Sequence, residues 1–129
     1  MLFMNRYTKG ARSERELLSI LEGKGYSVMR AAGSGVSSTS PDIIAIKNGK
    51  GLAFECKAWQ SNISIEKDKI AMLKQWKQNT SMQTMIAWRM NGKGWIFIEL
   101  EQLSEASRNY TVTMKNAALI GKRIEDVIS

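Results

Sequence analysis

Three charged residues, Asp42, Glu55 and Lys57, lie in a segment that is otherwise rich in apolar side chains. The segment reads PDIIAIKNGKGLAFECK, covers residues 41–57 and has an Asn-Gly pair near its middle. Asn-Gly between two apolar runs is the strongest short-range signal for a β-hairpin. Because side chains alternate between the two faces of a strand, Glu55 and Lys57 are expected on one face of the second strand.

Two turn lengths are compatible with this hairpin. With a two-residue turn Asp42 lies directly opposite Glu55, and with a four-residue turn it lies opposite Lys57. Both turns have an even number of residues, so both place the three charges on one face. The ordinary interpretation is a cross-strand salt bridge, which contributes only ~0–1 kcal/mol when exposed. Here, however, the strands are otherwise apolar, and Asp42 directly follows Pro41, which ends the preceding loop. The three charges therefore lie at the end of an apolar element, where functional sites commonly form.

This set of side chains suits metal-assisted hydrolysis of a phosphodiester. Mg²⁺ is a hard cation that prefers oxygen ligands and typically takes one or two carboxylates together with substrate phosphate. The ion polarises the phosphate and lowers the pKa of bound water. A neighbouring lysine can offset negative charge that grows in the transition state. We therefore expect Asp42 and Glu55 to be metal ligands and Lys57 to be catalytic.

A fourth candidate is Glu14, in an expected helix over residues 8–24. It precedes Leu17, Leu18 and Leu21 by three, four and seven residues, which places it on the apolar face. A carboxylate that faces a core is costly unless it is paired or bound to metal. From these residues alone, Glu14 is either a rim residue that reaches solvent or an arginine, or part of the site.

The remaining patterns predict a single α/β domain with a central mixed sheet covered by helices on both faces. Strands are expected at 26–31, 42–47, 51–59, 82–90, 95–100 and 110–114. Helices are expected at 8–24 (capped by Thr8), from 65 or 66 to 78 (capped by Ser64) and at 101–107, and an amphipathic stretch is expected at 120–128. The Gly/Ser-rich segment 32–41 predicts a loop. Cys56 faces away from Glu55 and is expected to be a buried, apolar thiol.

Composition narrows the choice of function. Nineteen Lys and Arg against twelve Asp and Glu give a net charge of +7, which favours polyanions and nucleic acid first. The absence of histidine excludes Ser-His and Cys-His nucleophile pairs and HExxH zinc sites. No apolar run reaches the ~18 residues of a membrane span. A single cysteine and the lack of a secretory signal predict a reducing, cytoplasmic setting.

The quoted residues resemble a known family. Pro41-Asp42 followed by Glu55-Cys56-Lys57 matches the PD…(D/E)-x-K signature of the restriction-endonuclease-like nucleases. A wider set of residues is similar to the archaeal Holliday junction resolvases: Lys9-Gly10, Glu14-Arg15-Glu16-Leu17, Gly25-Tyr26, Arg30-Ala31, Ser34-Gly35 and Pro41-Asp42-Ile43-Ile44-Ala45. The resemblance covers about residues 5–76 well and the rest weakly.

The resemblance implies a restriction-endonuclease-like fold in one nuclease domain, residues 1–129, in which residues 1–4 form an N-terminal extension. It implies a C2 homodimer, outside any membrane, that cuts four-way DNA junctions by paired nicks with Mg²⁺, or Mn²⁺ as a substitute. It gives catalytic roles to Glu14, Ser34, Asp42, Glu55 and Lys57, and metal ligation to the three carboxylates. Lys9, Arg12, Arg15, Arg30 and Ser34 surround this site and are expected to contact DNA.

Two other functions remain open at this point. The chain is also compatible with another nuclease of the same superfamily, such as a restriction or Mrr-like enzyme. A non-catalytic nucleic-acid-binding module would explain the basic charge and leave the three residues as a salt bridge. Residues 82–129 depart most from the family, which leaves the dimer surface and the junction preference open. The resemblance also leaves open whether the enzyme is cellular or viral.

Overall fold

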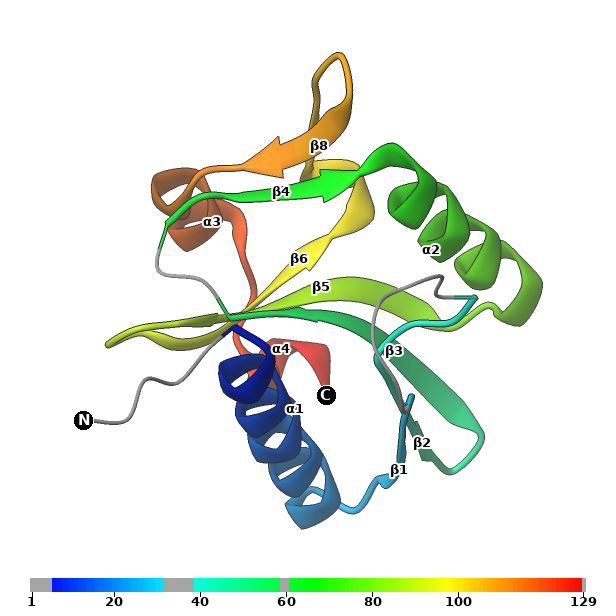
Figure 1. Ribbon diagram of the computed structural model, residues 1–129. Helices are drawn as coiled ribbons and strands as arrows, with labels where there is room; N and C mark the ends of the chain where they lie inside the picture. Colours follow the sequence, from blue (N-terminus) through cyan, green and yellow to red (C-terminus); the bar gives the residue numbers. More distant parts are fainter. Residues whose placement is uncertain (1–5, 32–38, 59–60, 129) are drawn as a thin grey trace.

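A five-stranded mixed sheet forms the centre of the molecule in a computed structural model, which describes residues 6–31, 39–58 and 61–128, with side chains from residue 10 onward (Figure 1). The strands, in spatial order, are β1 (Ser27–Arg30), β2 (Ile43–Lys47), β3 (Lys50–Lys57), β5 (Gln83–Met90) and β6 (Gly94–Glu99). β3 and β5 are parallel, and the other neighbouring pairs are antiparallel. The expected α/β class with a mixed sheet is confirmed.

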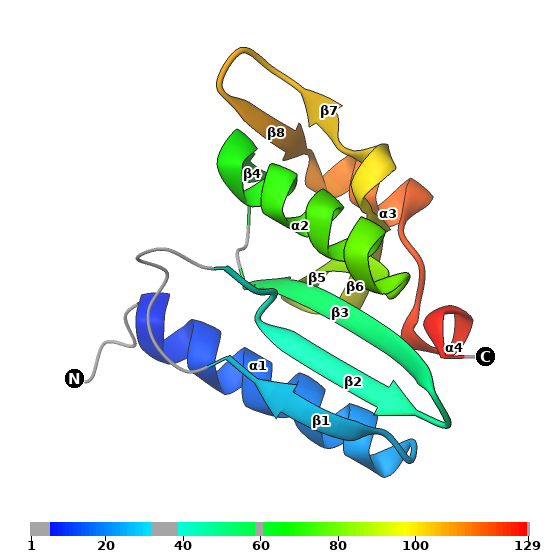
Figure 2. The same ribbon diagram turned by 90° about the vertical axis from the view of Figure 1, so that its right-hand side faces the viewer.

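The remaining elements cover this sheet or stand beside it. They are α1 (Arg6–Gly23), β4 (Ile63–Glu66), α2 (Lys67–Thr80), the 3₁₀ helix η1 (Leu100–Gln102), β7 (Ser104–Glu105), β8 (Asn109–Val112), α3 (Met114–Ile120) and α4 (Ile124–Val127). α1 and α2 lie on opposite faces of the sheet (Figures 1 and 2). Within the described part of the chain, no helix combines the length and apolar character needed to cross a membrane.

The alternation of side chains along the strands creates two apolar cores, one on each face. On the α1 face, Leu21 packs in a cluster with Phe54 and Phe97, whose ring centroids are 5.4 Å apart. On the α2 face, Leu73 packs in a second cluster with Trp88. Burial of one such side chain stabilises the fold by about 1.5–3 kcal/mol relative to exposure. The sheet is therefore held between two helices that meet different side chains of the same strands.

The β2–β3 hairpin has the shorter of the two turns considered from the sequence. Lys47 pairs with Lys50, so Asn48 and Gly49 alone form the turn, with φ angles of 52° and 79°. Positive φ at both central residues is the requirement of a type I′ turn, which matches the twist of the flanking strands. This turn fixes the register of the whole hairpin and therefore which side chains face each other at its open end.

The connection between the parallel strands β3 and β5 contains a strand that the sequence prediction missed. Ser64 was expected to cap a helix, but it pairs with Thr111 of β8 and lies within β4. Ile63 and Ile65 are buried while Ser64 and Glu66 are exposed, which is the period-two pattern of a strand. The helix begins only after Glu66. The Ser64 cap was therefore wrong, because pairing with β8 outweighs the local cap signal.

The C-terminal part also differs from the expected helix at 101–107 and amphipathic stretch at 120–128. Residues 101–107 form the end of η1 and then β7, and the stretch at 120–128 is divided between the end of α3 and α4. The division occurs at Gly121, where any side chain would collide with Ile96 of β6. A glycine here lets the chain pass close over the sheet, so the helix ends before it.

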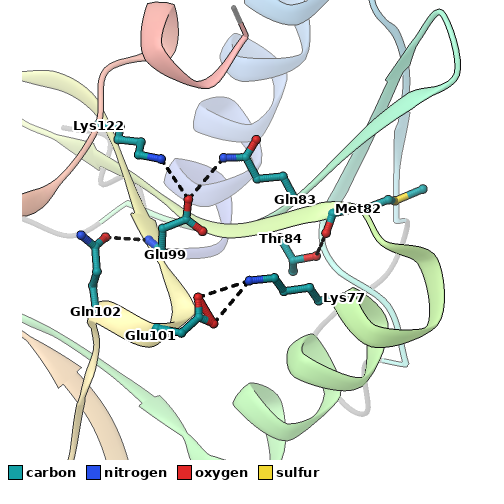
Figure 3. Close-up of polar contacts among 8 residues, drawn as sticks. All are labelled: Lys77, Met82, Gln83, Thr84, Glu99, Glu101, Gln102 and Lys122. Atoms are coloured by element: carbon teal, nitrogen blue, oxygen red, sulfur yellow. Dashed lines mark hydrogen bonds and ion pairs between the residues drawn. The ribbon is translucent and has the colours of Figure 1, made fainter.

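Polar contacts fasten this C-terminal segment to the edge of the sheet (Figure 3). Glu99 accepts hydrogen bonds from Gln83 at 3.3 Å and from Lys122 at 3.2 Å, and its backbone N–H donates to Gln102 at 2.9 Å. The Lys122 backbone also pairs with Phe97 in both directions, at 2.8 and 2.9 Å. The exposed edge of β6 is therefore partly covered by the chain's own C-terminal segment.

Candidate active site

The open end of the β2–β3 hairpin brings Asp42 and Glu55 together. Ile43 pairs with Phe54, and the same register carried one position outward puts Asp42, which directly precedes β2, opposite Glu55. Glu55 pairs with Ile86 of the α2-side core and therefore lies on the α2 face. One carboxylate oxygen of Asp42 accepts a hydrogen bond from the backbone N–H of Cys56 at 2.8 Å. This bond holds the Asp42 side chain against β3, the strand that carries Glu55.

Glu55 is a buried carboxylate with incomplete hydrogen bonding. It is only 3% exposed, and among the described residues its Oε1 atom has no hydrogen-bond partner. Its Oε2 atom lies 3.5 Å from the ammonium of Lys69. Burial and the charge of Asp42 raise the pKa of Glu55 from its ordinary 4.5 to about 7, against the opposing effect of Lys69 and Lys57. Such a group is costly to ionise unless a cation approaches it.

These two carboxylates fit a hard divalent cation. Residues 10–31, 39–58 and 61–128 contain no group of three or more His, Cys, Asp or Glu side chains arranged as one metal site. Mg²⁺ does not need such a group, because it usually keeps several waters and takes one or two carboxylates plus phosphate. The unpartnered Glu55 Oε1 atom next to Asp42 is the kind of oxygen that such an ion would bind.

Glu14 lies on α1, near enough to Asp42 for the two charges to affect each other. It is half-buried, and its Oε1 atom accepts a hydrogen bond from Nε of Arg30 at 2.6 Å. Burial raises the pKa of Glu14, and the nearby charge of Asp42 raises it further, while Arg30 lowers it. The structure therefore joins two sequence-predicted site residues in an ion pair. The role of Glu14 as a third metal ligand stays a prediction.

The C-terminal end of α1 leads into β1 through a tight turn. Gly25 has φ 91°, and the following Tyr26 N–H donates to the Leu21 carbonyl at 3.1 Å, which turns the chain from α1 directly into β1. Because β1 carries Arg30 and α1 carries Glu14, this tight turn fixes the two partners of the ion pair relative to each other.

Lys57 ends β3 two positions after Glu55, so its side chain leaves the same face of the sheet. It is half-buried, and its charge lowers the pKa of Glu55, as expected for a cation near the carboxylate. The intervening Cys56 packs against the α1-side core, and burial raises the pKa of its thiol. Cys56 therefore remains a protonated thiol, in agreement with the expected apolar role.

The residues predicted to contact DNA divide into three groups. Arg12 and Arg15 are exposed on α1, and the charge of Arg15 lowers the pKa of Glu14. Arg30 is engaged with Glu14. The side chain of Lys9 and all of Ser34 lie outside the described residues. All five assignments stay predictions.

Sequence reasoning missed Lys69, an α2 residue whose ammonium lies 3.5 Å from a carboxylate oxygen of Glu55. Through this contact, the Lys69 ammonium of α2 lies against the Glu55 carboxylate of β3. A signal was available, because Lys69 precedes Leu73 by four residues and so shares the apolar face of its helix. This is the same offset argument that drew attention to Glu14. Helical periodicity shows which face of α2 carries Lys69, but it does not show which residue of the sheet Lys69 contacts.

The pKa of Glu55 leads to a prediction about stability without metal. In the folded protein Glu55 keeps its proton up to about pH 7, whereas an ordinary glutamate releases it near 4.5. The resulting stabilisation is complete below about pH 4.5 and is lost as the pH rises through 7. Glu55→Gln removes this titration. The free energy of unfolding of the variant, relative to that of wild type, should therefore rise between pH 5 and pH 8, by up to roughly 3 kcal/mol.

Urea unfolding in EDTA at both pH values would measure this difference. Glu22→Gln, an exposed change on α1, serves as the matched control and should leave the difference between the two pH values unaltered. A gap between Glu55→Gln and wild type that stays constant from pH 5 to pH 8 would contradict the assignment of a buried, hard-to-ionise carboxylate.

Comparison with known proteins gives consistent matches over nearly the whole chain. The family model described as "Archaeal holliday junction resolvase (hjc)" matches residues 5–129. A Methanocaldococcus jannaschii protein, "Crossover junction endodeoxyribonuclease Hjc", is 34% identical over 116 residues, which cover 89% of this chain and 84% of the relative. "Crossover junction endodeoxyribonuclease Hje" of Saccharolobus islandicus is 31% identical over 121 residues, 92% of this chain and 76% of the relative.

Solved structures agree with these sequence matches. The Archaeoglobus fulgidus Hjc structure superimposes with a TM-score of 0.84 and 27% identity, covering 93% of this chain and all of that one. A bacterial homing endonuclease superimposes with a TM-score of 0.55 at 11% identity, covering 85% of this chain and 76% of that one, a likeness of fold alone. The C-terminal half, where the sequence departs most, is thus included in the structural agreement.

Proposed function

Because the chain belongs to the archaeal Holliday junction resolvase family, we propose that it is an endodeoxyribonuclease that resolves four-way DNA junctions by paired nicks. Family membership confirms the resemblance inferred from the sequence. The observation that carries the catalytic part is the buried carboxylate of Glu55, with one oxygen unpartnered among the described residues, opposite Asp42 at the end of a rigid hairpin. A non-catalytic binding module would gain nothing from burying a carboxylate with an unpartnered oxygen, because such burial is costly.

The proposed cofactor is Mg²⁺, with Mn²⁺ as a substitute, held by Asp42 and Glu55. When bound, such an ion polarises the scissile phosphate and lowers the pKa of a coordinated water. The protein's part is to present the ligands without rearrangement. The Cys56 N–H holds Asp42, and burial between the sheet and α2 holds Glu55. Glu55 lies on β3 and Asp42 directly precedes β2, so both ligands are close to strands, which fix side chains more firmly than loops do.

Lys57 supplies the positive charge of the reaction. Its ammonium leaves the same strand face as Glu55 and can orient the attacking water or donate to a phosphate oxygen. Interactions that strengthen as charge develops accelerate the chemical step, whereas uniform binding does not. We therefore assign Lys57 to transition-state stabilisation.

Binding of the substrate falls to the basic residues around the site. Arg12 and Arg15 are exposed on the α1 surface, and we propose that they contact backbone phosphates together with Lys9, Arg30 and Ser34. Phosphate contacts dominate nucleic-acid affinity. A junction has paired scissile strands, so we further propose a C2 homodimer with two such sites, in which each chain forms one nuclease domain. Since the substrate is DNA, we propose that it acts in the cytoplasm.

Glu14→Gln tests the third proposed carboxylate. The change removes the charge and retains the shape, and α1 keeps its apolar anchors, so the fold should remain intact. A ligand role, or a role in holding Arg30, requires the charge. We expect cleavage to be lost, or to require far more Mg²⁺, in single-turnover assays over a range of Mg²⁺ concentrations. Glu22→Gln on the same helix is the control, and full activity of Glu14→Gln at low Mg²⁺ would make Glu14 a rim residue.

A direct experiment distinguishes the proposed function from its rivals. A synthetic four-way junction and a linear duplex of the same sequence are each incubated with the protein in Mg²⁺ or in EDTA. Paired nicks in the junction alone, dependent on Mg²⁺, support the proposal. Cleavage of the duplex would indicate a different nuclease of the same superfamily. Binding of the junction without cleavage in Mg²⁺ or Mn²⁺ would indicate a non-catalytic module.

A further inference from the structure

Lys69 differs from the other α2 lysines in the partner that it contacts. Lys67 and Lys77 pair with acidic residues on surface elements, at 3.0 and 3.2 Å, and Figure 3 shows the contact from Lys77 to Glu101. Lys74 lies over the ring of Tyr110, 5.0 Å from its centroid. Lys69 instead faces the sheet, where it meets Glu55. Lys69 therefore contacts a residue of the candidate active site, whereas the other three lysines of α2 contact residues outside it.

The surroundings of this contact are unlike those of an ordinary surface salt bridge. The Lys69 side chain is 22% exposed, compared with 39% for Lys67 and 40% for Lys77, and the side chain of its partner Glu55 is 4% exposed. Screening by water weakens exposed pairs and leaves covered pairs much stronger. The Lys69 ammonium is 3.5 Å from one oxygen of Glu55, and among the described residues the other oxygen has no hydrogen-bond partner. The lysine thus supplies only part of the compensation that the carboxylate requires.

We propose that Lys69 is a positioning residue that acts as a built-in counter-ion of Glu55 and is displaced from it when a divalent cation binds. This inference rests on the proposed metal site and concerns its regulation. Without metal, Lys69 holds the carboxylate in place and offsets its buried charge. A divalent cation on the same carboxylate repels the ammonium, and the four-carbon stem of Lys69 can turn toward solvent. Metal binding therefore has to overcome electrostatic repulsion from the Lys69 ammonium.

Two opposing effects decide the sign of the result. Removal of Lys69 loses some preorganisation of Glu55, which would weaken metal binding. It also removes a positive charge that lies 3.5 Å from the carboxylate to which the cation would bind, and this would strengthen metal binding. Glu55 is already confined by burial on a central strand, so the lost preorganisation is small. The repulsion acts in a poorly screened site and outweighs it. Lys69→Met, similar in length and uncharged, should therefore bind the cation more tightly.

Mn²⁺ binding to the DNA-free protein tests this directly at pH 8. Free Mn²⁺ is followed by its electron paramagnetic resonance signal during titration. Lys69→Met should lower the Kd by about tenfold, which corresponds to 1.4 kcal/mol. Lys77→Met removes the same charge from the same helix, away from the site, and should leave the Kd close to that of wild type. Lys69→Arg keeps the charge and should also bind like wild type.

Thermal unfolding gives a second readout that a merely structural lysine would not produce. Without metal, Lys69→Met should be less stable than wild type at pH 8, because Glu55 loses its counter-ion. At saturating Mn²⁺ it should gain more in Tm than wild type does, because metal binding stabilises the folded state in proportion to affinity. A uniformly destabilised lysine variant would show the first effect without the second.

The outcomes separate this inference from the proposed function. If wild type binds Mn²⁺, Asp42→Asn does not, and Lys69→Met binds no more tightly than Lys77→Met, then the metal site stands and the counter-ion role is overturned. If neither wild type nor Lys69→Met binds Mn²⁺, both the metal site and the counter-ion role are overturned. Tighter binding by Lys69→Met alone, together with the larger gain in Tm, supports both.

Discussion

Replacement of Asp42 by asparagine is expected to abolish junction cleavage while leaving junction binding intact. The amide loses the negative charge that a cation requires but can still accept the hydrogen bond from the Cys56 N–H, so the hairpin keeps its register. No cationic contact to DNA is removed, and one negative charge near the phosphate disappears. Cleavage should fall to the level seen in EDTA, whereas binding should be unchanged or slightly tighter.

Single-turnover cleavage and gel-shift binding on the same four-way junction would measure the two parts separately. Asp68→Asn is the matched control, since it makes the same chemical change at an exposed position of α2. It should cut at the wild-type rate. Normal nicking by Asp42→Asn would end the metal-site hypothesis and would favour the simple cross-strand salt bridge.

Lys57→Ala should lose most of the rate even when Mg²⁺ and DNA are saturating. The expected loss is about 10²–10³ in the single-turnover rate, or roughly 2.7–4 kcal/mol, the usual effect of removing one donor to a developing charge. Because the missing interaction belongs to the transition state, the affinity for the junction should change little. Single-turnover rates measured at several DNA concentrations would separate these two quantities.

The control for this change lies on the same strand. Lys50→Ala removes an exposed lysine at the opposite end of β3, next to the turn, and should leave the rate unaffected. A loss of less than tenfold for Lys57→Ala would move Lys57 to a structural role and leave charge compensation to other residues.

The sequence was most informative where a local rule determines a long-range result. The Asn-Gly turn determines the hairpin register, and that register determines that Asp42 and Glu55 meet. Strand alternation then places Lys57 on their face and Cys56 on the other. These inferences needed no knowledge of the rest of the molecule, because a hairpin is a local structure and its period of two is strict.

Sequence reasoning failed where distant segments decide the outcome. Ser64 and its neighbours read as the start of a helix, and only pairing with β8, almost fifty residues later in the chain, makes them a strand. The ion pair of Glu14 with Arg30 depends in the same way on how α1 packs against β1. Helical periodicity places Lys69 on a face, but the identity of its partner follows from the packing of α2 on the sheet.

The parallel pairing of β3 with β5 has a consequence for the order in which the molecule assembles. The β2–β3 hairpin closes over a two-residue turn, whereas β3 and β5 meet only after the crossover through β4 and α2 has formed. Local pairings form early at low entropic cost, and long-range parallel pairings form late. During synthesis from the N-terminus, we therefore expect Asp42 and Glu55 to be joined while still in contact with water. The cost of burying Glu55 would then arise later, when α2 and β5 close over a site whose register is already determined.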